Sequence, residues 1–243
     1  GTNLHRSPYN SRNHEYYSED AVLTSGQAVA FISGGKEYGV IIAPKHLAFN
    51  DTEINRLGVS VFMTEQQARE NELRGTQASI EDAGALGVMT AFNRVGITAA
   101  NAHTGLLKNI LRGEWGFKGL ESQDFIMNPN YAVLKEYALN GGTMTTFTGE
   151  NTMAAVSEKF AYWTTENVGQ DTELMSAIKQ AMTWQAYALA NSNALDGMAS
   201  STRLVSVRTW YDNALVAVQV VFAALTVLAA AMYVLNDRKS KKQ

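Results

Sequence analysis

The alternation of apolar and polar positions between residues 81 and 124 predicts a strand, a helix and a second strand. An apolar run at 87–91 stops on polar residues, and apolar positions at helical spacing follow at about 104–112. A second short strand at 119–123 then ends at Asp124. This order is that of the βαβ unit, whose two strands lie parallel. Because the chemistry of parallel α/β folds collects where the strands end, Asp124 stands where a catalytic carboxylate is expected.

The same alternation of strands and helices extends over most of the chain. The helix at 64–83 begins at Thr64, with Gln67 three residues later in the spacing of a capping box. Residues 51–63 are predicted to be a loop. The remaining predicted elements are helices at 19–35, 129–139, 151–160 and from Asp171 to about Ala190, and strands at 40–43 and 143–147.

Two residues conflict with the elements predicted around them. Gly75 lies inside the helix at 64–83, where a glycine costs about 1 kcal/mol relative to alanine. Glu121 lies in the strand at 119–123, although parallel strands buried on both faces are normally hydrophobic runs. Glu121 therefore needs a partner or a distorted strand.

A long apolar segment near the C-terminus predicts a membrane-spanning helix. Residues 214–235 carry no charge, and a helix needs about 20 apolar residues to cross a bilayer. Trp210 and Tyr211 precede the segment, and residues 236–242 carry four positive charges against one negative. By the positive-inside rule the tail is cytoplasmic and the preceding residues lie outside the cell. A buried helix of a soluble domain is the alternative, and the basic cluster favours the membrane.

Composition excludes several classes of function. The 243 residues are 46% hydrophobic and 18% charged, which suffices for one sizeable core. A net charge of −3 gives no sign of nucleic-acid binding. The absence of cysteine excludes a disulfide framework, a thiol nucleophile and a cysteine-ligated zinc site. The four histidines show no paired ligand spacing, so we predict no metal site, and no phosphate or dinucleotide fingerprint implies an organic cofactor.

Several motifs resemble glycoside hydrolase family 3, the β-glucosidase-type enzymes. VMTAFN at 88–93 and LLKNILRGEWGFKG at 106–119, followed by a strand ending in Asp124, are similar to its N-terminal barrel domain. The first 20 residues resemble its N-x-H-R and G-R-x-x-E-x-x-S-E-D patterns. The resemblance implies the α/β class, with a partial (β/α)8 barrel of the TIM type. This barrel precedes the single C-terminal transmembrane helix predicted above from the apolar segment. The corresponding segments are the barrel at 1–197, a linker at 198–213, the helix at 214–235 and a basic cytoplasmic tail at 236–243.

The resemblance also assigns roles to particular residues. Asp124 matches the nucleophile of a retaining mechanism, and Arg12 matches the arginine that contacts the sugar nearest the scissile bond. Lys45 and His46 match the pair that hydrogen-bonds substrate hydroxyls. Met89 lies near the mouth of the barrel, where sugar contact and core packing are both open. Arg56, in the loop at 51–63, either reaches the sugar or forms a loop salt bridge.

The implied activity is that of a retaining, exo-acting β-glycosidase that hydrolyses O-glycosidic bonds of a carbohydrate such as a β-glucoside. In the family the acid/base residue usually comes from a separate domain, which nothing in this chain resembles. Some members of the family carry that domain before the barrel, and a barrel that runs directly into a C-terminal membrane helix fits this order. We therefore expect that domain upstream and little hydrolase activity from this chain alone. Phe92, where the family often has tyrosine, and Glu121 favour an alternative, a membrane-tethered, non-catalytic sugar-binding or interaction domain.

Overall fold

The computed structural model describes residues 1–56, 58–125, 133–146, 163–198, 202–203, 205 and 207–240. The chain divides into two units, Gly1–Asp196 and Gly197–Gln243, which are taken separately below. The predicted helix at 151–160 lies outside the described residues.

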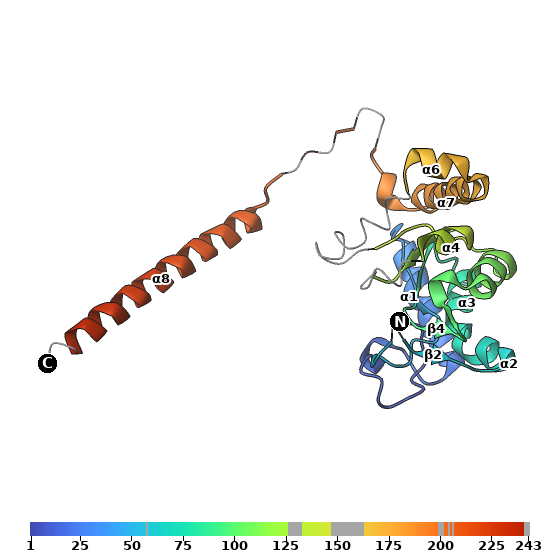
Figure 1. Cartoon of the computed structure of the whole chain (residues 1–243), viewed down its shortest axis with the longest axis horizontal. Coiled ribbons are helices and arrows are strands. Elements are labelled where there is room, and N and C mark those ends of the chain that lie inside the picture. Colours follow the sequence, from blue (N-terminus) through green and yellow to red (C-terminus); the bar gives the residue numbers. More distant parts are fainter. Residues whose placement is uncertain are drawn as a thin grey trace. The chain divides into compact units, whose positions relative to one another are not determined.

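The first unit is built on a parallel sheet (Figure 1). Its strands are β1 (Lys45–Leu47), β3 (Gly87–Thr90) and β6 (Leu120–Gln123), in the order β1-β3-β6. Helix η4 (Gly105–Glu114), wound as a π-helix, connects β3 to β6. The predicted βαβ unit is therefore confirmed, and it brings the ends of β3 and β6 to one edge of the sheet.

Further segments flank this sheet on both sides. The Thr2 N–H donates a hydrogen bond of 2.7 Å to the Lys45 carbonyl beside β1. On the other side, Met144 forms an isolated parallel bridge with Ser122 of β6. Within the described residues, the strand predicted at 143–147 is represented by this bridge alone.

A second, mixed sheet has its first strand in the predicted loop at 51–63. It consists of β2 (Ser60–Val61), β4 (Arg94–Val95) and β5 (Thr98–Ala99), with β2 parallel and β5 antiparallel to β4. The fold is thus α/β with mixed sheets. Within the described residues the parallel strands do not close into a barrel.

The strand predicted at 40–43 is displaced toward the C-terminus. Pairing with β3 begins at Pro44, whose carbonyl accepts from the Met89 N–H, and continues through Lys45. Proline lacks an N–H, so regular pairing is not propagated into the preceding residues. Of the apolar run 40–43, Ile42 packs against the core, whereas Val40 is 47% exposed.

The helix predicted at 64–83 is split into three consecutive pieces. They are α2 (Glu65–Gln67), the π-helical η2 (Ala68–Glu72) and α3 (Arg74–Glu81). The predicted N-cap is confirmed, because the Thr64 hydroxyl accepts from the Gln67 N–H at 3.1 Å.

Close packing of α3 on α1 (Ala21–Lys36) explains Gly75. A Cβ at Gly75 would lie 2.9 Å from the Thr24 Cγ2 and 3.2 Å from the Thr2 Cβ. The cost of this glycine in helix propensity is offset, because its lack of a side chain lets the two helices approach. The core beneath them includes Leu47, Val88, Leu107, Leu111 and Phe117.

The first unit contains further helices. Of the helix predicted at 129–139, the described part is α4 (Leu134–Leu139), which packs against α7 (Thr172–Ala190). The Asp171 carboxylate caps α7 as predicted, accepting from the Leu174 N–H at 3.0 Å. Shorter helices are η1 (Asn13–Glu15), η3 (Ala100–Ala102), α6 (Thr165–Gln170) and η6 (Asn193–Leu195).

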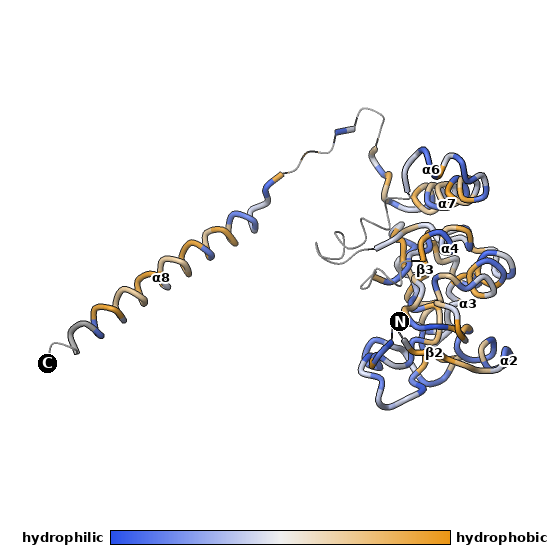
Figure 2. The backbone as a smooth tube through the Cα atoms, in the orientation of Figure 1, coloured by the Kyte–Doolittle hydropathy of each residue, from blue (hydrophilic) through white to orange (hydrophobic). Residues whose placement is uncertain are grey.

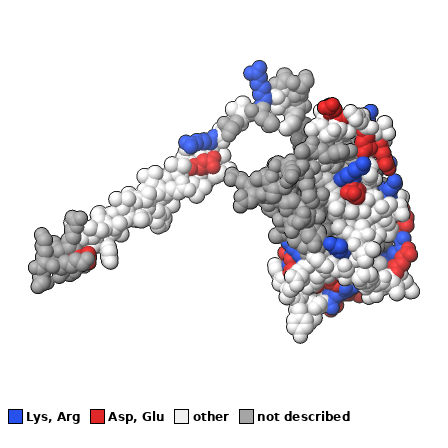
Figure 3. Space-filling model, in the orientation of Figure 1, with Lys and Arg blue, Asp and Glu red and all other residues white. Residues whose placement is uncertain are grey.

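The second unit is dominated by one helix, α8 (Trp210–Ser240). Its span Trp210–Asp237 reaches a mean hydropathy of 2.4, and Figure 2 shows the apolar residues along its length. Figure 3 shows charged side chains toward its ends and none along its body. Trp210 and Tyr211 lie in the first turn of this helix and precede its uncharged stretch 214–235. The helix is long and apolar enough to cross a membrane.

Candidate active site

Asp124 follows β6 directly and is 9% exposed. Its Oδ1 accepts a hydrogen bond of 2.9 Å from the Phe125 N–H, and its Oδ2 lies 3.6 Å from the His46 Nε2. Burial raises the pKa of Asp124, while the Phe125 N–H and the nearby Arg56 guanidinium act in the opposite direction. The result is a partly desolvated carboxylate aimed at a histidine.

His46 is fixed on β1 by asparagine side chains. The backbone N–H of His46 donates to the Asn3 Oδ1 at 2.7 Å, and the Asn3 Nδ2 donates to the backbone carbonyl of His46 at 2.9 Å. The Asn50 Nδ2 lies 3.4 Å from its Nδ1. Burial, followed by the positive charges of Arg12 and Lys45, lowers the pKa of His46 to about 2. The imidazole is therefore neutral at physiological pH.

One carboxylate, Glu15, holds two cations beside this pair. The Arg12 Nε and terminal nitrogen donate to its two oxygens at 2.8 and 2.7 Å, a bidentate arrangement. The Lys45 Nζ lies 3.1 Å from the same carboxylate. The hydrogen bonds from Arg12 are the largest cause of the low Glu15 pKa, about 2. Glu15 thus remains ionised and fixes both cations.

The charged network continues through Glu53 to Arg56. A Glu53 oxygen lies 3.6 Å from an Arg12 nitrogen, and its other oxygen lies 2.8 Å from an Arg56 nitrogen. The Arg56 Cζ stands 4.4 Å from the centroid of the Phe92 ring, a cation–π contact. The loop salt bridge of Arg56 is therefore present, and Arg56 also faces Asp124 electrostatically. Phe92 supports this guanidinium.

Met89 lies between the two strands that carry the other candidates. Its register partners are Lys45 on β1 and Ser122 on β6. Because side chains alternate along a strand, Met89 shares a sheet face with Ser122 and, two residues later, Asp124. The side chain is half-buried, which is compatible with either sugar contact or packing. The fold thus gathers all five sequence-predicted residues at one end of the sheet.

Four residues of this arrangement were not among the predicted site residues. Glu15 follows Arg12 by three positions, and Glu53 precedes Arg56 by three, so these spacings carried a signal for ion pairs. Asn3 and Asn50 carried none, because an amide that orients a distant histidine looks like any other loop asparagine. Asn50 also donates to the Tyr16 hydroxyl at 3.0 Å and to Glu53 at 3.1 Å.

Glu121 lies on the opposite face of β6, in register with Val88. It is fully buried, and neither carboxyl oxygen has a hydrogen-bond partner within the described part of the chain. Burial raises its pKa to about 7, and the nearby Arg112 guanidinium opposes the shift. The predicted conflict between charge and strand is present, and β6 pairs regularly with β3 around it. Glu121 is separate from the Asp124 site.

The sequence matches a family model and several curated proteins. A model described as Glycosyl hydrolase family 3 N terminal domain matches residues 2–159. Beta-glucosidase B of Emericella nidulans is 40% identical over 122 residues, which are 50% of this chain and 14% of that protein. The beta-glucosidase of Rhizobium radiobacter is 39% identical over 123 residues, which are 51% of this chain and 15% of that protein. The chain therefore spans a small part of the length of these relatives.

Solved structures match over a larger share of the chain. Beta-glucosidase 3B from Thermotoga neapolitana, in complex with glucose, aligns with a TM-score of 0.68 and 27% identity over 79% of this chain and 26% of that one. A beta-glucosidase from Paenibacillus barengoltzii aligns with a TM-score of 0.68 and 26% identity over 84% of this chain and 23% of that one.

Proposed function

Since the chain belongs to glycoside hydrolase family 3, we propose that it carries the nucleophile side of a retaining, exo-acting β-glycosidase site. The observation that supports this most is the placing of Asp124. Its carboxylate lies buried at the end of β6, 3.6 Å from the neutral His46 and beside the Arg12–Glu15–Lys45 cluster. The substrate would be a β-glucoside or a similar carbohydrate.

In this mechanism an Asp124 oxygen attacks the anomeric carbon of the sugar. The bond from that carbon to the leaving oxygen breaks, and an acid donates a proton to the leaving group. Water then attacks the anomeric carbon of the glycosyl ester and gives up a proton to the same acid/base group. The bond to Asp124 breaks, and its carboxylate is released. Partial burial favours the first step, because a less solvated carboxylate is a better nucleophile. The Phe125 N–H holds Oδ1, and Oδ2 faces His46.

The basic groups would position the sugar. Arg12 is a rigid donor array whose orientation is fixed by Glu15, and Lys45 is held by the same carboxylate. The neutral His46 donates or accepts without adding charge. Donors fixed before the sugar binds reduce the entropy lost in forming the transition state. Met89 would contact an apolar face of the ring.

The general acid would come from outside this arrangement. Glu15 has its pKa lowered to about 2, so it cannot deliver a proton at neutral pH. Glu53 is paired with Arg12 and Arg56. We place the acid/base residue on a separate domain, upstream in the same protein. This chain alone is therefore expected to have little or no activity on a nitrophenyl β-glucoside.

Covalent labelling separates the nucleophile from the acid. We expect 2,4-dinitrophenyl 2-deoxy-2-fluoro-β-glucoside to add one fluoroglucosyl group to Asp124, detected by mass spectrometry of peptides. Dinitrophenolate leaves without a proton from an acid, and the fluorine slows the second step, so the ester accumulates. Asp124→Asn should remove the adduct, while the exposed control Asp82→Asn should keep it.

Two outcomes would contradict the proposal. A chain that stays unlabelled under saturating reagent would lack a working nucleophile, and a label on another residue would reassign it. Robust turnover of the nitrophenyl β-glucoside that is lost in Asp124→Ala would instead refute the separate acid/base domain.

The second candidate is a membrane-tethered sugar-binding or interaction domain without catalysis. The Phe92 ring, engaged by Arg56, lacks a hydroxyl to donate toward the nucleophile, which favours this candidate. Calorimetry with glucosides discriminates between the two sugar-based functions, since binding by the intact protein without hydrolysis supports a binding domain. Unchanged sugar binding by the Arg12→Ala and Lys45→Ala variants would argue against both sugar-based functions.

We also propose that the β1-β3-β6 sheet is a sector of a (β/α)8 barrel over residues 1–197, with a linker at 198–213. The parallel strands joined through helices support this. Residues 214–235 would cross the cell membrane once, leaving the barrel outside and the basic tail 236–243 in the cytoplasm. The uncharged stretch 214–235 within α8 and the four positive charges that follow this stretch support this topology.

A further inference from the structure

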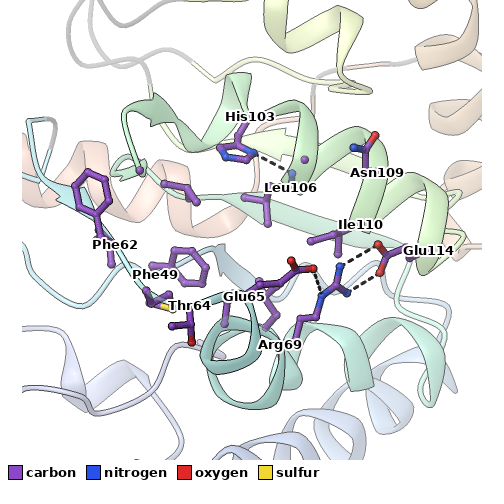
Figure 4. Close-up of a pocket in the computed structure, with 17 residues that line it drawn as sticks. Phe49, Phe62, Thr64, Glu65, Arg69, His103, Leu106, Asn109, Ile110 and Glu114 are labelled. Carbon is purple, nitrogen blue, oxygen red and sulfur yellow. Dashed lines mark hydrogen bonds and ion pairs between the residues drawn. The ribbon is translucent and has the colours of Figure 1, made fainter.

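We propose that a second site, distinct from the Asp124 site, binds an uncharged, mostly apolar small molecule. It is a half-open cleft of about 480 Å³ between the β2–β4 sheet and the helices η2 and η4 (Figure 4). None of Arg12, Lys45, His46 and Asp124 lines it. Its volume falls within the usual range for ligand pockets, about 300–1,000 Å³.

The walls of the cleft are apolar and continuous with the core. Phe49, Val61, Leu73 and Leu106 belong to the buried cluster, and Ile110 packs against it. Shielding such a surface from water favours the binding of an apolar ligand. The body of the ligand is therefore expected to be a hydrocarbon or an aromatic ring system.

The charged groups of the cleft disfavour an anion. Arg69 is the cation, and its three nitrogens donate to Glu65 at 2.8 Å and to Glu114 at 2.6 and 3.0 Å. With two carboxylates against one satisfied guanidinium, no unpaired positive charge awaits a carboxylate or phosphate ligand. Figure 4 shows this trio at one end of the cleft, where it joins α2 to η4.

His103 supplies a polar contact away from that trio. Its Nδ1 accepts from the Leu106 N–H at 3.0 Å, so the neutral ring carries its proton on Nε2. Burial lowers the pKa of His103, which keeps the ring neutral. Nε2 is thus a donor for a carbonyl, ether or hydroxyl oxygen on the ligand.

Both helices that wall the cleft are π-helical, which is a separate indication of a site. These segments are Ala68–Glu72 and Gly105–Glu114. π-Helical turns are rare and recur at functional positions. Two of them face one another across this cleft.

The test uses methyl NMR of the full chain in nanodiscs, with indole as the uncharged probe. We expect saturable shifts in the methyl signals of Val61, Leu106 and Ile110, and at least about tenfold weaker shifts with anionic indole-3-acetate. Ala68→Phe fills the cleft and should weaken indole binding by at least about tenfold. The matched control Ala30→Phe, on the exposed face of α1, should leave binding unchanged.

Three results would overturn the proposal: no saturable shift at these methyls up to the solubility of indole, equal binding of indole-3-acetate, or wild-type binding by Ala68→Phe. If Ala68→Phe does not fold, Val95→Phe blocks the cleft from the β4 side and replaces it. These readouts do not depend on hydrolase activity, so the result is independent of the function proposed for Asp124.

Discussion

At the scale of single residues, Glu15 controls the arrangement of the candidate active site. It binds Arg12 through both oxygens and Lys45 through one of them. Removing its charge leaves two half-buried cations without their shared partner. In the proposed site, Glu15 would therefore be as important for positioning a sugar as the cations that would touch it.

We expect Glu15→Gln to lower the free energy of unfolding by about 1–2 kcal/mol, since the pairs are partly buried and partly screened. Urea denaturation followed by tryptophan fluorescence would measure this. The control Glu65→Gln removes an exposed ion pair with Arg69 and should cost less than about 1 kcal/mol. Equal effects of the two substitutions would show that Glu15 has no special structural role.

Glu121 makes stability depend on pH. Its folded pKa, about 7, lies above the ordinary value of 4.5, so the folded state holds the proton more tightly. Its contribution is most favourable below pH 4.5 and is lost as pH rises toward 7, by about 3 kcal/mol in total. We expect Glu121→Gln to match the wild type at pH 4 and to exceed its stability at pH 8, measured by urea denaturation.

The exposed control Glu136→Gln should follow the wild-type curve at both pH values. Burial also raises the pKa of Glu72 to about 7, so Glu72 changes stability with pH in the same direction as Glu121. The Glu121→Gln variant should therefore keep part of the pH dependence. A Glu121→Gln curve parallel to that of the wild type would contradict this prediction.

At the scale of elements, two glycines in helices should respond oppositely to alanine. Gly75→Ala places a Cβ 2.9 Å from the buried Thr24 Cγ2, so we expect a loss of about 1–3 kcal/mol despite better helix propensity. Gly26→Ala, on the exposed face of α1 with no atom within 4 Å, should gain up to about 1 kcal/mol. Urea midpoints of both variants check this, and a gain at Gly75 would disprove the tight contact.

The strand and helix order was predictable where a local pattern repeats. β3 appeared as an apolar run that stops on polar residues, and the structure has β3, β6 and α1 within a few residues of their predicted bounds. β1 was displaced because its place is set by pairing with β3, and a ladder partner leaves no local mark. The two-residue strands of the β2–β4–β5 sheet are too short to show an alternation.

The candidate site was predictable from motifs, but its internal order was not. Arg12, Lys45, His46 and Asp124 could be singled out because strand ends and matching motifs marked them. The distances among them depend on Glu15, Glu53, Asn3 and Asn50, which act through side-chain hydrogen bonds across many residues of sequence. Such bonds follow from the three-dimensional fold and have no one-dimensional period.

At the scale of the whole molecule, the two units differ in the surroundings they require. The first unit buries its apolar residues in a core, whereas the described residues of α8 leave theirs exposed. A free helix with so much apolar surface would aggregate in water, because burial of that surface is strongly favourable. A bilayer would remove that penalty.

We expect the intact chain to remain in the membrane pellet after alkaline carbonate extraction. Leu225→Arg with Leu228→Arg should release it, since each arginine near the centre of a span costs about 2.5–3.5 kcal/mol. The control pair Asn236→Arg with Asp237→Arg, at the basic end, should stay in the pellet. Release of the wild type by carbonate would argue against a membrane span.

The charge count around Asp124 has a consequence for the second half of the proposed reaction. Lys45, Arg12 and Arg56 are balanced by Glu15, Glu53 and Asp124 in the resting protein. Esterification of Asp124 would erase one negative charge and leave an excess positive potential over the glycosyl ester. A small anion such as azide would be attracted by this potential, and the Asp124 carboxylate would be stabilised as its negative charge returns on release. Breakdown of the intermediate would therefore be electrostatically favoured by the very bond that forms it.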